Sequence, residues 1–434
     1  MNTKSLALAL FALSCAPWLT AQPVDETQLK FAVVFSRHGV RSPAVANSTL
    51  DNFSVLPFPA FGIDPGLVTS HGAAVETILG GYYRLWLTQE GLLTGNDTGD
   101  AALVYIRANV AEVTTKPTAQ AFAAGLLPGA SVNVYLYPGS SDPLFDPVGA
   151  GFALLDRRMA VAAVTGRLGG DPQSLASAYA PELALTRSVL FGYPASQTPV
   201  PATPEGKLDV TTLPIAITAG RAVASVGLST IAAAVDPFMM EYAGGMPGAD
   251  VAWGLLNAAG VSETLRLDTL TLDLAYRTPY LAKVQSSNLA SHVARSLVQA
   301  ATGNATAGAL GTPSSKLIVL FASDVHVSGL AGLFQIGWLV PGYPKNYSAP
   351  GGAMVFELRQ SQTTGEYIVR TAYIAQSLDQ LRNSTALTLA APPAIAPLFI
   401  PGCSVRNATY DCPLAAFVKM ANRAIDPQSA DLVN

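Results

Sequence analysis

Charged residues are scarce in this sequence, and neither sign dominates. Only 12% of the 434 residues are Asp, Glu, Lys or Arg, and the 25 basic and 29 acidic side chains give a formal net charge of −4 at pH 7. A protein that binds nucleic acid needs a basic surface to neutralise phosphates. This balance argues against a nucleic-acid partner, and any anionic ligand must be attracted by local charge.

Cysteine and histidine are rarer still, with three and four copies in the chain. Cys403 and Cys412 lie nine positions apart, with no histidine beside them. In an exported protein such a pair is most simply a disulfide that closes a small loop. No spaced set of His, Cys, Asp and Glu indicates a metal site, so we expect no metal and no other cofactor.

Apolar runs long enough to span a membrane are also missing. The N-terminus has Lys4, an apolar stretch from Leu6 to Ala16 and a small-residue exit, which predict a secretory signal peptide over residues 1–21. Cys15 fits a lipoprotein site poorly. The long uncharged run of residues 384–405 contains four prolines and suits a surface segment. We therefore predict a periplasmic or secreted protein with no membrane contact after signal cleavage.

The most informative stretch that the chain does contain is FAVVFSRHGVRSP, residues 31–43. Its short apolar run lacks helical periodicity and predicts a strand buried on both faces. The strand ends in Arg37, His38 and Arg41. Ligands of open α/β sheets bind at this carboxyl edge, and buried positive charge there needs an anion or an acid as partner.

A second apolar run ends in a similar way. KLIVLFASDVHVSG, residues 316–329, places Ser323, Asp324 and His326 between a strand and a helix N-terminus, which favours anions. If the two strands are neighbours, Asp324 meets the His38 cluster. A neutral imidazole can attack phosphorus, arginines can stabilise phosphoryl oxygens, and a carboxylic acid can protonate the leaving alcohol.

Each of these residues also has an ordinary structural explanation. His38 between two arginines suits a surface cluster paired with acidic neighbours. Asp324 suits a helix N-cap. A histidine placed like His326 is more often a bystander than a ligand, and we interpret His71 and His292 as structural.

The order of apolar patterns predicts an α/β fold with a mixed central sheet flanked by helices. Strand-like and helical segments alternate before residue 149 and again after residue 254. Residues 149–254 are alanine-rich, with an expected helix over 215–235 and no convincing strand. We predict an α/β core domain from residues 22–148 and 255–434, and a smaller, mostly α-helical domain inserted beside the active-site edge.

The segment Arg37-His38-Gly39-Val40-Arg41-Ser42-Pro43 resembles the R-H-G-x-R-x-P signature of the histidine acid phosphatase family. This family belongs to the histidine phosphatase superfamily, in the branch that includes bacterial phytases and glucose-1-phosphatases. Other segments that match the family follow in its order over roughly 400 residues: GLVTSHG (66–72), TAQAFAAGLLP (118–128), DPLFDP (142–147), GMP (245–247), RTP (277–279) and GCSVRNATYDCPLAAF (402–417).

The resemblance implies a role for each residue of the signature. His38 would be the phosphorylated nucleophile, Arg37 and Arg41 would bind the phosphate, and Asp324 would donate the proton. It also implies an α/β core, a smaller helical domain that caps the site, and a C-terminal tail closed by a disulfide.

Two positions depart from the family pattern. Members carry an arginine before the TAxAF helix, where this chain has Val113 in a segment one residue longer, and they have His-Asp where this chain has Ser323-Asp324. Losing one donor to transition-state charge costs about 3 kcal/mol. Lys116, Ser323 and His326 are the candidates for replacement phosphate contacts.

We therefore expect an exported phosphomonoester hydrolase, of the acid phosphatase or phytase type, that acts on a small phosphorylated substrate through a phosphohistidine. The alternative is a weakened family member that binds phosphate esters with little turnover. An enzyme adapted to another phosphorylated substrate lies between the two.

Overall fold

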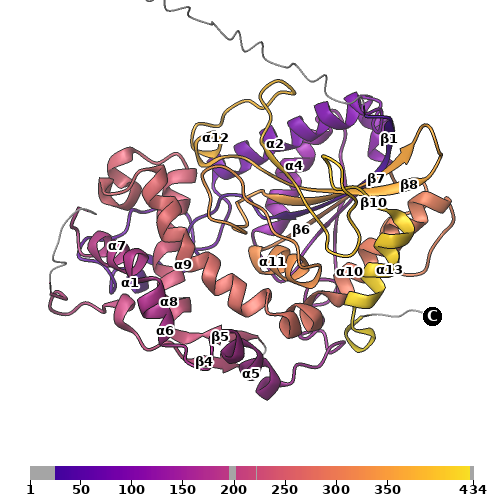
Figure 1. The fold of residues 1–434 in the computed structure, drawn as a ribbon. Coiled ribbons are helices and arrows are strands. Elements are labelled where there is room, and N and C mark those ends of the chain that lie inside the picture. The colour runs from indigo at the N-terminus through magenta and orange to yellow at the C-terminus, as the bar shows by residue number, and fades with distance from the viewer. Residues whose placement is uncertain (1–24, 195–201, 221, 431–434) are drawn as a thin grey trace, which may run out of the picture.

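The computed structural model describes residues 25–194, 202–220 and 222–430, and the predicted signal peptide lies outside these ranges. Its strands in the main sheet are β1 (Thr27–Arg37), β2 (Val104–Ala108), β3 (Val134–Leu136), β6 (Leu317–Ala322), β7 (Ala353–Ser361), β8 (Tyr367–Ala375), β9 (Ala394–Pro397) and β10 (Cys412–Pro413). These eight strands are ordered β10-β8-β7-β1-β6-β2-β3, with β9 paired to β8 (Figure 1).

The sheet is mixed, as the sequence predicts. Strands β1, β6, β2 and β3 run parallel to one another, whereas β7 pairs with β1, and β8, β9 and β10 pair within the sheet, in antiparallel fashion. Residues 31–35 of β1 and all of β6 are uninterrupted apolar runs, as expected for strands covered on both faces. Phe31, Val33 and Phe35 enter one apolar cluster, and the alternating Ala32 and Val34 enter the other.

Helices cover both faces of this sheet (Figure 1). α2 (Ser70–Gln89) and α4 (Thr115–Leu126) pack on one face, and α10 (Pro279–Thr302), α11 (Asp324–Leu333) and α13 (Leu414–Ala424) pack on the other. The remaining helices outside residues 149–254 are α1 (Asn47–Leu50), α3 (Asp97–Ala101), α9 (Ala258–Tyr276), α12 (Leu378–Arg382) and a 3-10 turn, Pro427–Ser429.

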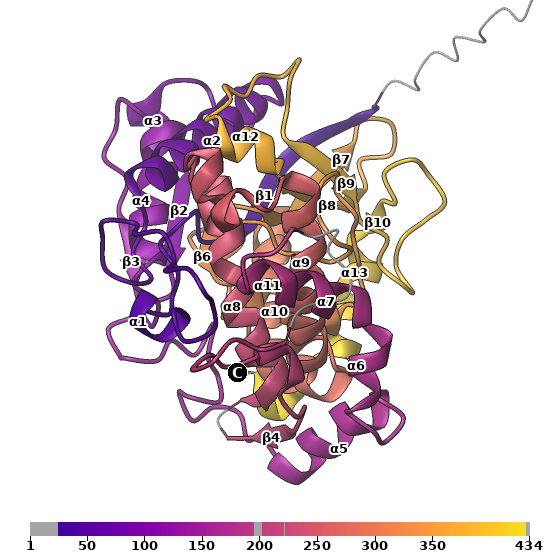
Figure 2. The ribbon, with the colours of Figure 1, turned by 90° about the vertical axis from the view of Figure 1, so that its left-hand side faces the viewer.

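The segment between residues 149 and 254 is mostly helical, and Figures 1 and 2 place its α5 and β4 together at the lower end of the molecule. Its helices are α5 (Arg157–Arg167), α6 (Ser174–Ala178), α7 (Ala180–Leu190) and α8 (Val226–Ala243), with 3-10 turns at Val210–Thr212 and Gly248–Gly254. It also contains a hairpin of β4 (Ile217–Ala219) and β5 (Val223–Ser225).

That hairpin contradicts the expectation of an unbroken helix over 215–235 without strands. β-Branched Ile217, Thr218 and Val223 flank Gly220, a composition that favours two short strands around a turn. Helix α8 begins only at Val226. The domain boundaries themselves stay a prediction.

Two further predictions from the sequence concern the disulfide and membrane-spanning segments. The disulfide between Cys403 and Cys412 is present, with the Cα atoms 5.3 Å apart, and confirms the predicted pairing. Within the described residues, no helix combines the length and the apolar character that crossing a membrane requires.

Candidate active site

The ends of β1 and β6 meet at one edge of the sheet because the two strands are parallel neighbours. Arg37 lies opposite Ala322 in the register, and the His38 N–H donates to the Ala322 carbonyl at 2.8 Å. Ser323 and Asp324 follow Ala322 directly. The fold thus joins the two predicted halves of the site from distant parts of the chain.

The Arg37 side chain is almost completely buried, with 1% of its surface exposed. Its Nη2 pairs with Asp324 Oδ2 at 2.8 Å, and its Nη1 donates to Ser348 O at 2.6 Å and to the Tyr347 hydroxyl at 3.3 Å. A buried guanidinium is tolerated only with such partners. Arg37 is therefore held in one orientation by the protein.

His38 is 4% exposed, and its ring orientation is set by its own loop. Nδ1 lies 3.0 Å from the Gly39 carbonyl, which can only accept, so the hydrogen is on Nδ1 and the lone pair on Nε2. Burial, followed by the charges of Arg37 and Arg41, lowers the pKa of His38 to about 3. The imidazole is consequently neutral across the physiological pH range, as a nucleophile requires.

Arg41 is paired with a carboxylate from the inserted segment. Its Nη1 and Nη2 donate to Asp236 Oδ2 and Oδ1 at 2.9 and 3.3 Å, and Asp236 belongs to α8. Asp268, on α9, is also part of this charge cluster. Burial, and then the charge of Asp324, raise the pKa of Asp268 to about 7. Neither aspartate was predicted from the sequence, although Asp236 is the only charge in the apolar run 231–240.

Asp324 is the first residue of α11. Its Oδ1 accepts the Val325 N–H at 2.8 Å, while its Oδ2 pairs with Arg37. Burial alone would raise the pKa of Asp324, but Arg37, His38 and Arg41 together lower it below the ordinary value. The resting site therefore holds an Asp324 carboxylate next to the loop of residues 37–41, which we call the nucleophile loop.

Ser323 and His326 serve as the cap of α11. The Ser323 N–H donates to His326 Nδ1 at 3.3 Å, and the Ser323 hydroxyl lies 3.1 Å from the same nitrogen. With Nδ1 as the acceptor of the Ser323 N–H bond, the ring carries a hydrogen on Nε2. Glu112 Oε1 lies 3.7 Å from His326 Nδ1 and accepts a hydrogen bond from Asn109 at 3.2 Å. Helix α11 therefore begins at Asp324, directly after Ser323.

The segment before α4 has Val113 at the position where the family resemblance predicts an arginine. Val113 is 65% exposed. Lys116 is exposed as well and lines a surface depression with Gln120 and Asn133, separate from the pocket beside His326. Its place in the fold gives no support to a phosphate contact.

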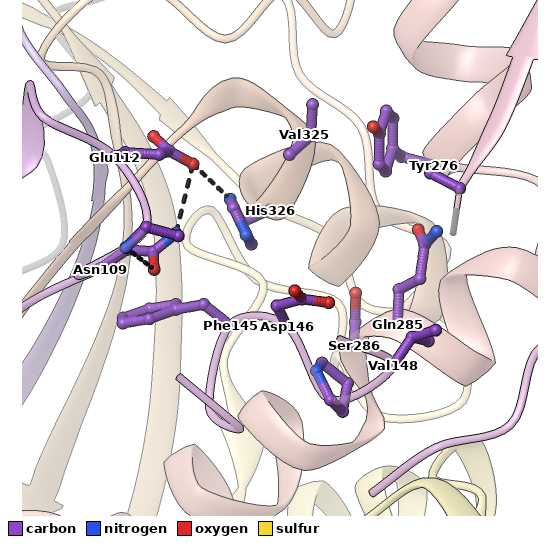
Figure 3. Close-up of a pocket in the computed structure, with 13 residues that line it drawn as sticks. Asn109, Glu112, Phe145, Asp146, Val148, Tyr276, Gln285, Ser286, Val325 and His326 are labelled. Atoms are coloured by element: carbon purple, nitrogen blue, oxygen red, sulfur yellow. Dashed lines mark hydrogen bonds and ion pairs between the residues drawn. The ribbon is translucent and has the colours of Figure 1, made fainter. Parts of the chain in front are cut away.

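A cavity of about 250 Å³ lies beside the first turn of α11 (Figure 3). The residues that line it come from the β2–α4 connection, the segment after β3, the β4–β5 turn, and helices α9, α10 and α11: Asn109, Ala111, Glu112, Phe145, Asp146, Pro147, Val148, Ala222, Tyr276, Gln285, Ser286, Val325 and His326. In the described ranges, no three His, Cys, Asp or Glu side chains are arranged to hold a metal ion.

The carboxyl group of Glu76 is buried against the nucleophile loop. Glu76, on α2, is 1% exposed and fills the space beside Gly39 and Gly351, where an added Cβ would come within 2.7 and 2.3 Å of its Oε1. Gly351 also has φ +66°, which favours glycine. Burial raises the pKa of Glu76 to about 8.

This carboxyl group makes folding stability depend on pH. Between the ordinary pKa of 4.5 and the folded value of about 8, the folded protein keeps a proton that the unfolded chain has lost. Stability therefore falls as pH rises through this window, by a few kcal/mol in all. We expect Glu76→Gln to flatten the fall in Tm between pH 5 and pH 8, measured by thermal unfolding.

Glu241, whose pKa burial also raises to about 8, should preserve part of the slope. The exposed Glu366 provides the control, since Glu366→Gln should keep the wild-type profile. A Glu76→Gln protein with an unchanged slope would contradict the assignment.

The comparisons with known proteins cover nearly the whole chain. No family model matches it. Phytase AppA of Escherichia coli is 29% identical over 414 residues, 94% of either chain. A glucose-1-phosphatase of Providencia rettgeri is 27% identical over 444 residues, covering 98% of this chain and all of the relative. The structure of Hafnia alvei phytase with myo-inositol hexakis sulphate is 30% identical, with a TM-score of 0.83, and covers 94% of this chain and 99% of the phytase.

Proposed function

This chain belongs to the histidine acid phosphatase family, and on that premise we propose that it is an exported phosphomonoester hydrolase that works through a phosphohistidine intermediate. The observation that carries the proposal is His38. It is neutral, its Nε2 lone pair is free, and it lies between Arg37 and Arg41 beside Asp324.

The reaction would begin with attack of His38 Nε2 on the phosphorus atom. Arg37 and Arg41 would take the equatorial phosphoryl oxygens, which spread the charge of the transition state. Each arginine is now paired with an aspartate, so the incoming phosphate competes with Asp324 and Asp236 for their N–H groups. Water would then hydrolyse the phosphohistidine and release phosphate.

Asp324 would protonate the leaving alcohol. In the resting site the arginines keep its pKa low. A phosphate dianion would offset that positive charge, so the pKa of Asp324 rises when substrate binds and the carboxyl group can take up a proton. Turnover should therefore be faster in mildly acidic solution than at neutral pH.

We expect Asp324→Asn to slow hydrolysis in proportion to how much the leaving group needs a proton. The loss should be about 10²- to 10⁴-fold for an alkyl phosphate and clearly smaller for p-nitrophenyl phosphate, whose leaving group departs unprotonated. Steady-state kcat on both substrates measures the split. Equal losses on the two would show that Asp324 acts by positioning and not as an acid.

Phosphate contacts other than those of Arg37 and Arg41 are less well supported in this chain. Ser323 can donate one hydrogen bond, and His326 has an Nε2 hydrogen available, so both stay candidates for phosphate contacts. Lys116 would have to leave its own surface depression to reach the site. With Val113 in place of an arginine, at least one transition-state contact is missing.

That missing contact motivates the alternative of a phosphate-ester-binding protein with little turnover. Calorimetric binding of a phosphate ester without detectable product would support it. The proposed hydrolase is tested by assaying release of p-nitrophenol from p-nitrophenyl phosphate near pH 5. Steady turnover that depends on His38 supports the hydrolase, and absence of turnover with the folded protein overturns it.

Export and substrate class complete the proposal. The predicted signal peptide over residues 1–21 and the Cys403–Cys412 disulfide both suit a periplasmic or secreted protein. Relatives named phytase and glucose-1-phosphatase point to a small phosphorylated substrate. These two names differ in one important respect, because inositol hexakisphosphate carries many phosphates and glucose 1-phosphate carries one.

A further inference from the structure

Asp268 belongs to the charge cluster of the site, but the proposed reaction gives it no role. It lies on α9 and is partly buried. Asp324 and Asp236 are each paired with an arginine, whereas no hydrogen bond or ion pair within the described part of the chain engages the Asp268 carboxyl group. A polar group held in this way is costly unless a ligand or water bonds to it.

The packing of α9 directs Asp268 toward the nucleophile loop. Asp268, Leu272 and Tyr276 are spaced four residues apart and therefore share one face of the helix. Tyr276, on that face, lines the cavity beside α11 (Figure 3). α9 also packs against α8, which carries Asp236, and against α11, which begins at Asp324. Three helices thus bring one carboxyl group each to the two arginines of the loop.

The electrostatics of Arg37 and Tyr347 place Asp268 close to both. Burial alone would lower the pKa of Arg37, but neighbouring groups raise it. Asp324 contributes most, followed by Tyr347 and Asp268. Burial raises the pKa of Tyr347, Arg37 opposes this shift, and Asp268 adds to it. Asp268 therefore lies near the guanidinium group that would bind the phosphate.

The cluster holds one carboxyl group more than it has cations. Arg37 and Arg41 face three carboxyl groups, those of Asp236, Asp268 and Asp324. If all three were ionised, the cluster would carry net negative charge and would repel a phosphate dianion. Burial, and then the charge of Asp324, raise the pKa of Asp268 to about 7. In mildly acidic solution this carboxyl group therefore keeps its proton and can donate a hydrogen bond.

We propose that protonated Asp268 donates a hydrogen bond to a phosphoryl oxygen of the substrate, and that loss of this proton weakens phosphate binding. The proposal rests on the proposed hydrolase function and adds a phosphate contact to those of Arg37 and Arg41. The proton stays on Asp268, because protonation of the leaving alcohol falls to Asp324. A hydrogen bond to a charged acceptor is stronger than one between neutral groups.

Other ionisable groups face Asp268 or the nucleophile loop, and their titrations have to be kept apart from its own. They are Arg37, His38 and Arg41 of the loop, Asp236 of α8, Asp324 of α11, Tyr347 before β7, and Glu76 of α2. Burial lowers the pKa of His38 to about 3, far below the window of interest. Burial raises the pKa of Glu76 to about 8, so Glu76 needs a variant of its own.

The pH profile of kcat/KM for p-nitrophenyl phosphate tests the proposal. This profile reports groups of the free enzyme, and the leaving group of this substrate needs little help from Asp324. With the pKa of Asp268 near 7, we expect kcat/KM of the wild-type protein to fall about tenfold between pH 6 and pH 8. Asp268→Asn keeps an N–H donor at every pH, so its kcat/KM should match wild type at pH 6 and stay there at pH 8.

Asp268→Leu removes the donor together with the charge. We expect its profile to be flat as well, but with kcat/KM at pH 6 lower by about 10- to 100-fold, the scale of one hydrogen bond to a charged group. Equal kcat/KM in Asp268→Asn and Asp268→Leu would show that no hydrogen bond reaches the substrate, and would overturn the proposal.

Two glutamates supply matched controls. Glu263 lies on the same helix and pairs with Arg266 at 3.3 Å, and Glu263→Gln should keep the tenfold fall. Glu76→Gln should keep it too, because Glu76 contacts the glycines beside the loop and not the phosphate. A fall that persists in Asp268→Asn, or that disappears in Glu76→Gln, would assign the titration to another group.

Sulfate binding gives an answer that does not depend on turnover. Sulfate resembles the phosphoryl group and keeps its two charges over this pH range. Its Kd for the wild-type protein, measured by calorimetry, should rise about tenfold between pH 6 and pH 8 and should stay constant for Asp268→Asn. The same pH dependence in both proteins would reject the proposal. If p-nitrophenyl phosphate is not hydrolysed at all, the hydrolase function has failed, while the sulfate experiment still decides the role of Asp268.

Discussion

Replacing His38 with alanine should reduce kcat for p-nitrophenyl phosphate by about 10⁴-fold or more, the scale seen when a covalent nucleophile is removed. The reason is specific to this ring. Its Nδ1 hydrogen is held by the Gly39 carbonyl, so that Nε2 alone presents a lone pair. The same change should abolish a phosphoenzyme that rapid quenching traps in the wild-type protein.

His292 provides the matched control. It lies on α10, away from the sheet edge, with its ring bonded to the Gly308 carbonyl. We expect His292→Gln to keep wild-type turnover and to form the phosphoenzyme. If His38→Ala retained both while its thermal unfolding matched wild type, another nucleophile would have to be sought.

Arg37 should matter for both stability and catalysis. Arg37→Met leaves the Asp324 carboxylate without its 2.8 Å partner and the Ser348 carbonyl without its donor. Breaking a buried ion pair from one side costs about 3–5 kcal/mol. We expect urea unfolding at pH 7 to show a loss of that order, and kcat/KM to fall at least about 10²-fold because a transition-state contact is gone.

The double variant Arg37→Met with Asp324→Asn separates the two effects. Neutral asparagine removes the uncompensated charge, so part of the lost stability should return while activity stays low. If the single variant were as stable as wild type, the ion pair would not contribute to holding the sheet edge together. If the double variant regained activity, the catalytic roles of both residues would be wrong.

The strand ends were predictable because their sequence signals are local. An apolar run followed at once by polar residues predicts both a buried strand and its edge, and this applied to residues 31–41 and to residues 316–324. The parallel pairing of β1 with β6 then brings Arg37 within 2.8 Å of Asp324. The mixed sheet and the disulfide were predictable for similar reasons.

Other parts of the site carry no local signal. Asp236, Asp268 and Glu76 are acidic residues within helices that no local motif marks. Only tertiary packing reveals that the first two share one charge cluster and that the third lies beside Gly39. The β4–β5 hairpin was missed because its short strands lie in alanine-rich sequence that also suits a helix. Ser323 and His326 likewise reveal their capping role only once the start of α11 is known.

The position of β6 has a consequence for how the protein is made. β6 lies between β1 and β2 in the sheet, yet the ribosome synthesises it roughly 200 residues after β2. At about 5–20 residues per second, the two earlier strands wait some tens of seconds with open apolar edges. A nascent chain in that interval is exposed to wrong strand pairing, and under the proposed export the same delay would favour translocation before folding. The central strand thus acts as a late step that completes both the sheet and the catalytic edge.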